Sequence, residues 1–333
     1  MTLRGLIGLL ALVVLGLLAW ELRWVLLVLF GAVVLAVALD VPVSWLRRFT
    51  PMNRPQALTV VVLLLLLGGW QLGEVLLPEL IEQVQQFTQL VPALLNRVGE
   101  LLGGVAMLES LEGRVAELAT FDKLQPLGGQ LLGFAGGAAN GTIQLLLMVL
   151  LALLLVLDPR SHQRLVVAAT PAHYRGMAGE LLSACRQALG GWLAGMTISA
   201  SAVFLLTWAG LAALKVPLAL LSGLVCGLLT FVPTIGPTVA TLLPLAVALL
   251  VSPALALQVL ILRLVLQNAE AFLLTPLLLS RTVNLLPTVA LMAQLSLGAL
   301  LGLPGVLLAL PLVVVLQVLS QRVLVEQIMD RWL

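Results

Sequence analysis

Residues 216–262 read VPLALLSGLVCGLLTFVPTIGPTVATLLPLAVALLVSPALALQVLIL, a block of 47 residues without aspartate, glutamate, lysine or arginine. A membrane-spanning helix needs about 20 mostly apolar residues, so this block can hold two of them. Further blocks without these charged residues recur along the chain, at residues 5–20, 24–39, 55–73, 124–157, 187–214 and 282–321. The runs are continuous rather than alternating, which excludes a membrane β-barrel. The pattern therefore predicts an all-α fold, that of a polytopic helical membrane protein.

The composition excludes several classes of protein. Of the 333 residues, 61% are hydrophobic and 10% are charged, whereas an ordinary soluble domain has about 25% charged residues. A soluble enzyme and a secreted disulfide scaffold are excluded, and a net charge of +2 predicts no nucleic-acid partner. The two cysteines, Cys185 and Cys226, lie in apolar surroundings and indicate neither a disulfide framework nor a metal site. The sequence has no nucleotide-binding loop or catalytic motif, so we expect no enzyme, no catalytic residues and no cofactor.

The charges between the apolar blocks predict how the chain crosses the membrane. The first run, residues 5–20, is interpreted as a retained first span rather than a signal peptide. The loop before the third span carries Arg47, Arg48 and Arg54 without an acid, so the positive-inside rule places it in the cytoplasm. The stretch 74–128 carries eight acidic and three basic residues and is expected on the opposite side. By the same rule, both termini are predicted to be cytoplasmic.

The loops divide the chain into three predicted parts. Residues 1–78 are an N-terminal bundle of three spans, residues 79–128 an acidic amphipathic helical segment outside the membrane, and residues 129–333 a C-terminal membrane bundle. A heptad seam in the middle part needs another helix to bury it; its residues are Leu80, Val84, Phe87, Val91, Leu94, Val98 and Leu101. The seam packs on its own bundle or the membrane surface in one interpretation, and joins the subunits of a homo-oligomer in the other. Pro92 predicts a kink or break within the seam.

Proline and glycine interrupt two apolar blocks of the C-terminal half. Proline lacks a backbone N–H and glycine is permissive, so one straight helix cannot run through a Pro-x-x-Gly-Pro element. We therefore predict two broken helical hairpins, at residues 217–251 and 288–321. Such interrupted segments point to a substrate site in secondary transporters, although they also occur as ordinary tight turns between membrane helices. The predicted hinge residues are Pro233, Gly236, Pro237, Gly302, Pro304, Gly305 and Pro311.

A polar stripe lies on the helix expected at about 255–275, between the two hairpins. Arg263, Gln267 and Glu270 share one helical face, with Asn268 beside them. A charge near the bilayer centre costs about 2.5–3.5 kcal/mol on insertion scales, so the stripe is expected to face the bundle interior, a cavity or a partner subunit. In one hypothesis the four residues line the translocation route, with Glu270 accepting a proton or a cation. In the other, Arg263 and Glu270 neutralise each other through Gln267 and fix the helix packing.

The remaining polar residues in apolar surroundings have simpler interpretations. Asp40 ends the second span and is expected at the membrane interface. Asp158 precedes Pro159 and is expected to cap the helix that follows. His162 and His173 have no carboxylate or cysteine set around them in the sequence, so no metal site is expected there.

Five motifs follow one another in the C-terminal half. They are Phe231-Val-Pro233-Thr-Ile-Gly236-Pro237, Gln267-Asn-Ala-Glu270, Leu274-Thr-Pro276, Asn284-Leu-Leu-Pro287 and Gly298-Ala-Leu-Leu-Gly302-Leu-Pro-Gly305-Val-Leu-Leu-Ala-Leu-Pro311. Upstream of them lie Asp158, Thr170-Pro171 and Tyr174-Arg175. In this order the motifs resemble those of the autoinducer-2 exporter (AI-2E) family of bacterial permease-like proteins.

The resemblance implies a transporter of the bacterial inner membrane with about eight membrane helices, embedded in the lipid bilayer. It also implies a homo-oligomer, since pentamers are known in the family. Members of the family are linked to export of the signalling furanone autoinducer-2 and to sodium/proton antiport. Fold transfers between relatives more readily than substrate does.

Three functional hypotheses follow from the residues and the resemblance together. The leading one is a secondary transporter that exports a small solute and is driven by an ion gradient. The first alternative is a sodium (or lithium)/proton antiporter on the same scaffold, with Glu270 as the carboxylate that titrates. The second alternative is a channel-like or scaffolding membrane oligomer, which the heptad seam favours.

Overall fold

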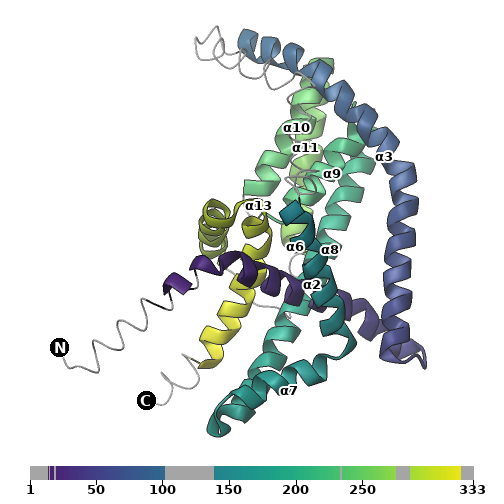
Figure 1. Cartoon of the computed structure of the whole chain (residues 1–333). Coiled ribbons are helices and arrows are strands. Elements are labelled where there is room, and N and C mark those ends of the chain that lie inside the picture. Colours follow the sequence, from purple (N-terminus) through teal and green to yellow (C-terminus); the bar gives the residue numbers. More distant parts are fainter. Residues whose placement is uncertain are drawn as a thin grey trace, which may run out of the picture. The chain divides into compact units, whose positions relative to one another are not determined.

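The computed structural model describes residues 14, 16–18, 20–101, 139–232, 235–274 and 286–323. Every element in these residues is helical, which confirms the predicted all-α fold for the described part of the chain (Figure 1). A 3₁₀ turn, η1 (Ala172–Tyr174), and a π-helical turn, η2 (Glu270–Leu274), accompany the α-helices. The α-helices are α2 (Arg23–Phe49), α3 (Arg54–Leu101), α6 (Ala139–Leu157), α7 (Pro159–Ala169), α8 (Arg175–Ala213), α9 (Ala219–Leu229), α10 (Ile235–Val251), α11 (Pro253–Ala269) and α13 (Pro287–Leu319).

The lengths and composition of the helices are those of a polytopic membrane protein, as predicted. Among the described residues, 5 helices are long and apolar enough to cross a membrane, or 6 if the bent pair α6–α7 counts as one span. The helices α9 and α10 are apolar but shorter. Most of the predicted first span, residues 5–20, lies outside the described residues.

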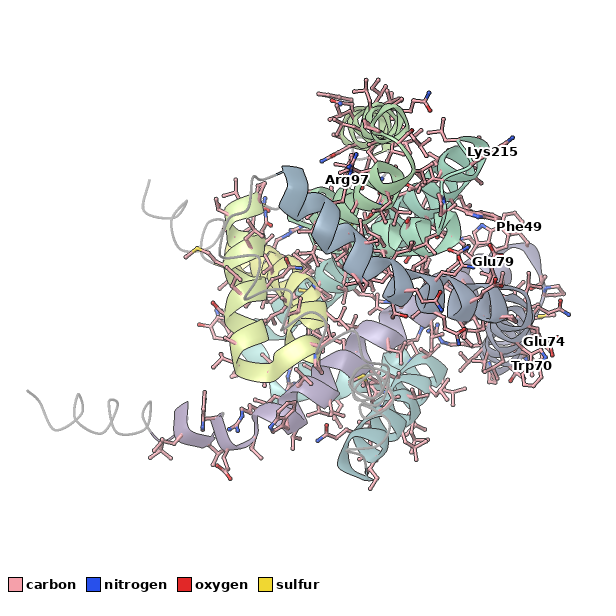
Figure 2. The ribbon with its side chains drawn as sticks, turned by 90° about the horizontal axis from the view of Figure 1, so that it is seen from above. Phe49, Trp70, Glu74, Glu79, Arg97 and Lys215 are labelled. Carbon is pink, nitrogen blue, oxygen red and sulfur yellow. The ribbon has the colours of Figure 1, made fainter. Side chains whose placement is uncertain are left out.

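Helix α3 carries a large exposed apolar surface. Only 6% of the residues in its most apolar stretch are buried, and Trp70, labelled in Figure 2, is 69% exposed. A helix surrounded by lipid is expected to have such a surface. The helix continues through Pro78 and Pro92, so the break considered at Pro92 does not occur. A long helix absorbs the lost N–H bond of a proline by bending, and Figure 1 shows α3 bending along its length.

The chain folds into two compact units, each assembled from separate pieces of sequence. Unit 1 consists of Met1–Leu58, Thr142–Leu189 and Met292–Leu333. Unit 2 consists of Thr59–Gly141 and Gly190–Leu291. The three-part division by membrane side, at residues 78 and 128, stays a prediction.

The core of unit 2 lies where the end of α8 meets α9, α10 and α11. Its buried residues are Leu211, Val216, Leu218, Val247, Ala248, Ala256 and Val259. Phe87 and Leu90 of α3 pack against this core, and the side-chain carbonyl of Gln83 accepts the backbone N–H of Leu221 at 2.8 Å. Phe87 of the heptad seam therefore packs within its own unit. The rest of the predicted extramembrane segment, residues 102–128, lies outside the described residues.

The first predicted hairpin breaks where expected. Helix α9 ends at Leu229, α10 begins at Ile235, and the two pack against each other. A Cβ on Gly236 would lie 1.9 Å from the carbonyl oxygen of Leu229, so only glycine fits this contact. Pro237 lies inside the first turn of α10, because backbone N–H groups have no helical partner there and a missing one costs nothing. Pro233 lies outside the described residues.

The second predicted hairpin breaks at Gly302. The helical hydrogen bonding of α13 runs from Pro287 to Leu319, but Gly302 has φ +66° and ψ −150°, which no helix contains. This conformation is essentially restricted to glycine. A Cβ on Gly305 would lie 2.1 Å from the carbonyl oxygen of Leu297, so the two arms meet backbone to backbone. Pro304 and Pro311 lie in the second arm.

Asp158 caps α7, as predicted from the sequence. Its carboxylate accepts the backbone N–H of Ser161 at 3.2 Å. This hydrogen bond lowers the pKa of Asp158 below its ordinary value of 3.8, so the cap stabilises α7 at neutral pH and is lost as the pH falls below that value.

We therefore expect Asp158→Ala to fray the first turn of α7 without unfolding the protein. The mechanism is the loss of the cap, which leaves the Ser161 N–H without its partner. Hydrogen exchange of the α7 amides at neutral pH is expected to quicken by less than about tenfold. Exchange in α7 identical to that of wild type would contradict the capping role.

Candidate functional site

Arg263 of α11 is the centre of a buried polar cluster in unit 2. Its side chain is almost entirely enclosed, with the residue 3% exposed. One guanidinium nitrogen, Nη1, donates to the hydroxyl of Thr207 at 3.0 Å, and Nε donates to the hydroxyl of Thr241 at 3.2 Å. Thr207 belongs to α8 and Thr241 to α10, so three helices converge on this one cation.

The hydrogen-bond partners of Arg263 are neutral hydroxyl groups. A buried cation is costly unless it is paired or hydrogen-bonded, and hydroxyl groups satisfy its donors without cancelling its charge. In the described part of the chain no ion pair joins Arg263 to Glu270. No direct ion pair therefore cancels the charge of Arg263, which can attract an anionic or strongly polar group.

Glu270 lies about two helical turns after Arg263, immediately beyond the end of α11. It begins the π-helical turn η2, which follows α11, and such turns are frequent at functional sites. The hydroxyl of Ser199 on α8 donates to the Glu270 carboxylate at 3.2 Å. Ser199 is buried and Glu270 is half-buried, so the carboxylate has one polar partner from another helix.

The structure brings three of the four predicted stripe residues to the interior. Arg263 is buried, Gln267 and Glu270 are half-buried, and all three lie on one face of α11 and η2. Asn268 differs, because it is exposed and its amide donates to the carbonyl of Leu264 on its own helix at 2.7 Å. Arg263 and Glu270 each find a hydroxyl partner on α8 rather than each other.

Sequence reasoning missed the hydroxyl partners Ser199, Thr207 and Thr241. Single hydroxyls in an apolar helix look ordinary, since they can bond their own backbone. A spacing signal was nevertheless present: Ser199 and Thr207 are eight residues apart on α8, close to the seven between Arg263 and Glu270. Two helices running in opposite directions bring such pairs together.

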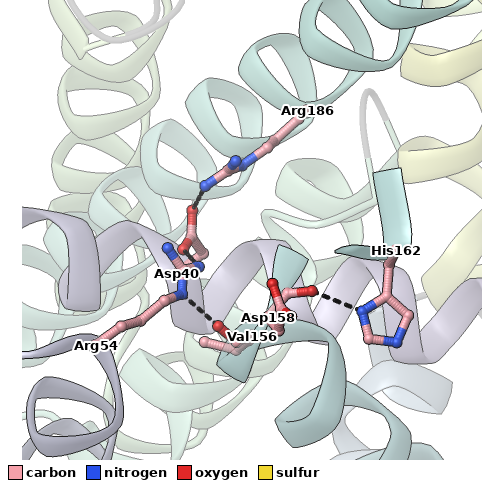
Figure 3. Close-up of polar contacts among 6 residues, drawn as sticks. All are labelled: Asp40, Arg54, Val156, Asp158, His162 and Arg186. Atoms are coloured by element: carbon pink, nitrogen blue, oxygen red, sulfur yellow. Dashed lines mark hydrogen bonds and ion pairs between the residues drawn. The ribbon is translucent and has the colours of Figure 1, made fainter. Parts of the chain in front are cut away.

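A second polar cluster lies in unit 1 around Asp40 (Figure 3). Asp40 of α2 is buried, and its two carboxylate oxygens form ion pairs with Arg54 and Arg186. Arg54 also donates to the backbone carbonyl of Val156, at the end of α6. The carboxylate thus connects α2 with the first residue of α3 and with α8. Sequence reasoning had interpreted Asp40 only as a residue at the membrane interface.

An apolar cavity of about 410 Å³ lies beside the Asp40 cluster. Side chains of α2, α6, α7, α8 and α13 line it, among them Phe30, Val33, Leu155, Val166, Leu181 and Val315. Asp40, Arg54 and Arg186 contribute to its wall. A cavity of this size can hold a small amphipathic molecule or part of a longer one.

The histidines show no metal site. Nδ1 of His162 lies 2.7 Å from the backbone carbonyl of Asp158, one turn earlier in the chain (Figure 3). Among the described residues, no group of three or more His, Cys, Asp or Glu side chains could hold a metal ion.

Comparison with known proteins identifies the family. Residues 9–324 match the family described as "AI-2E family transporter". The chain belongs to this family. AI-2E proteins are membrane transporters and not enzymes, so the protein is a multi-pass membrane transporter, in agreement with its long apolar helices.

Several relatives of this AI-2E transporter carry names beginning "Putative transport protein". The sll0063 protein of Synechocystis sp. is 29% identical over 301 residues, which cover 86% of this chain and 74% of the relative. The MT0215 protein of Mycobacterium tuberculosis is 31% identical over 310 residues, covering 85% and 78%. The YrrI protein of Bacillus subtilis is 24% identical over 280 residues, covering 80% and 78%.

Proposed function

We propose that this AI-2E transporter is a secondary transporter of the bacterial inner membrane that exports a small solute, such as an autoinducer-2-like signal or a similar small metabolite. An ion gradient drives it, since the sequence carries no nucleotide-binding loop. The observation that carries the proposal is the polar cluster of unit 2. There Arg263 and Glu270 each hydrogen-bond to hydroxyl groups of other helices instead of forming a direct ion pair.

The solute passes along the face of α11 and η2 that carries Arg263, Gln267 and Glu270, with Asn268 at its outer edge. Ionisable residues inside membrane spans often mark such routes, because placing them in the bilayer costs free energy and they are rare there without a function. The broken hairpins at residues 217–251 and 288–321 supply the moving parts. Interrupted helices of this kind surround the substrate in other secondary transporters.

Sodium (or lithium)/proton antiport is the second candidate function. The Glu270 carboxylate and the Ser199 hydroxyl place two oxygen atoms together, and hard cations prefer oxygen ligands. A proton and a cation would compete for the same carboxylate, which is the simplest form of exchange.

Orientation and assembly complete the proposal. The arginine-rich loop at residues 47–54 supports a cytoplasmic side for both termini. A homo-oligomer, a pentamer by the family resemblance, is consistent with the exposed apolar surface of α3. Lipid bilayer, a small solute and sodium ions or protons are the partners that this function requires.

Transport in proteoliposomes with an imposed pH gradient tests the proposal. Wild-type protein is expected to move one of three solutes, namely sodium, lithium or autoinducer-2, and to require the gradient. Glu270→Gln keeps the size of the side chain and can still accept the Ser199 hydrogen bond, but an amide cannot bind and release a proton. The gradient-driven flux is therefore expected to fall at least about tenfold.

The matched control is Glu74→Gln, which removes an acid from the exposed face of α3 and is expected to transport like wild type (Figure 2). Unchanged gradient-driven transport by Glu270→Gln would contradict the role of Glu270. Solute flux that needs no gradient would favour a channel-like protein instead.

A further inference from the structure

Helix α7 leaves the end of α6 at a bend of 92°. Residues 145–157 of α6 are all apolar, and we infer that this helix crosses the membrane; a helix at a right angle to it then lies along the membrane surface. None of the residues of α7 is buried, and Leu165 is 73% exposed. A short helix with exposed leucine on one side and arginine on another is typical of the lipid headgroup region.

One side of α7 forms a basic groove with the beginning of α8. The groove has a volume of about 420 Å³, and every ionisable residue that lines it is an arginine: Arg160, Arg164 and Arg175. The nearby carboxylate of Asp158 does not line the groove and is engaged with the Ser161 N–H. Three cations in one groove without an acid favour an anionic ligand.

The arginines of the groove are positioned to bind such a ligand. Arg160 and Arg164 are one turn apart on α7, so their side chains leave the same face of the helix. Arg175 is anchored by the backbone carbonyls of Thr170, at 3.2 Å from Nε, and of Ala168, at 3.4 Å from Nη2. A guanidinium has five N–H donors, so Arg175 keeps donors for a phosphate after making these two bonds.

The other side of α7 faces the apolar cavity beside the Asp40 cluster. Pro159, His162 and Val166 line that cavity from α7, while Gln163 and Leu182 line both the cavity and the groove. The two spaces are therefore neighbours with α7 as their common wall. The charges in the cavity wall, those of Asp40, Arg54 and Arg186, are engaged with one another.

We propose that this region binds an anionic phospholipid. Its phosphate lies among Arg160, Arg164 and Arg175, and one acyl chain enters the apolar cavity past Gln163 and Leu182. A free phosphate would use only the groove, whereas a lipid uses both spaces. The position of α7 along the membrane surface supplies lipid headgroups directly to the groove.

Native mass spectrometry of the full-length protein in detergent tests the proposal. The probes are dioleoylphosphatidylglycerol, dioleoylphosphatidylcholine with the same chains but no net charge, and inorganic phosphate. Wild-type protein is expected to retain phosphatidylglycerol in preference to phosphatidylcholine. The double variant Arg160→Gln/Arg164→Gln is expected to bind phosphatidylglycerol roughly tenfold or more weakly, from the usual attraction of two basic residues to an anionic lipid surface.

Two further variants separate the headgroup from the chain. Arg47→Gln/Arg48→Gln removes the same charge from exposed positions outside the groove and is expected to bind like wild type. Val166→Trp fills the cavity and is expected to weaken phosphatidylglycerol binding while both arginines remain. Equal binding of the two lipids, an unaffected Arg160→Gln/Arg164→Gln variant, or inorganic phosphate that displaces the lipid at equal concentration would overturn the proposal.

Discussion

Protein carrying Gly236→Ala or Gly305→Ala is expected to fold poorly, with a loss of stability of at least about 3 kcal/mol. The added Cβ would lie 1.9 Å from the carbonyl oxygen of Leu229 in the first case and 2.1 Å from that of Leu297 in the second. Real Cβ atoms never approach backbone oxygen so closely, and a backbone oxygen cannot turn away as the end of a side chain can. The arms of each hairpin must therefore separate, which exposes their packed faces.

The amount of monodisperse protein in detergent and its thermal unfolding temperature measure this effect. Gly68→Ala is the matched control, because nothing lies within 4 Å of the new Cβ in α3. This control is expected to be neutral or slightly stabilising, since alanine favours helix more than glycine does. Wild-type unfolding temperatures for Gly236→Ala and Gly305→Ala would show that the hairpins are not packed as described.

Asp40→Asn is expected to cost about 3 kcal/mol, the second-largest effect. The change leaves Arg54 and Arg186 close together without the carboxylate that neutralises both. Breaking a buried ion pair on one side commonly costs about 3–5 kcal/mol, and the lower end applies here because the Arg186 side chain is 37% exposed. Thermal unfolding in detergent measures the loss.

A double variant tests whether the loss of stability comes from the arginine charges left without a carboxylate. Asp40→Asn combined with Arg186→Gln removes one of the two uncompensated cations, so it is expected to be more stable than Asp40→Asn alone. Glu180→Gln, an exposed acid on the same helix α8, is expected to unfold like wild type. If Asp40→Asn also unfolds like wild type, the ion pairs contribute nothing to stability.

The helical membrane fold and both hairpin breaks could be predicted from the sequence. At membrane depth the backbone must satisfy its own hydrogen bonds, so apolar blocks leave few structures to choose from. Gly302 shows how local the signal is, because a single glycine and the proline two residues later mark the break. The extent of the first break is predicted less well, because Pro237 can stand either outside a helix or, as here, in its first turn.

The partners of the charged residues could not be predicted in the same way. Arg186 and Asp40 are 146 positions apart, and their ion pair depends on how α2 and α8 pack. Arg263 illustrates the same limit in unit 2: its polar character was evident, but its threonine partners come from two other helices. Local pattern indicates which residues are costly to bury, whereas tertiary packing decides what compensates for them.

The backbone contact between Gly305 and Leu297 has a kinetic consequence. Side chains of packed helices interdigitate, so sliding one helix past another requires the side chains to change rotamer. Here the backbone of Gly305 faces the carbonyl of Leu297, so at this one contact there is no side chain of residue 305 to change rotamer. We therefore expect motion of the two arms about Gly302 to meet a low barrier at this contact. The missing Cβ would then allow both the close fit of the arms and their movement.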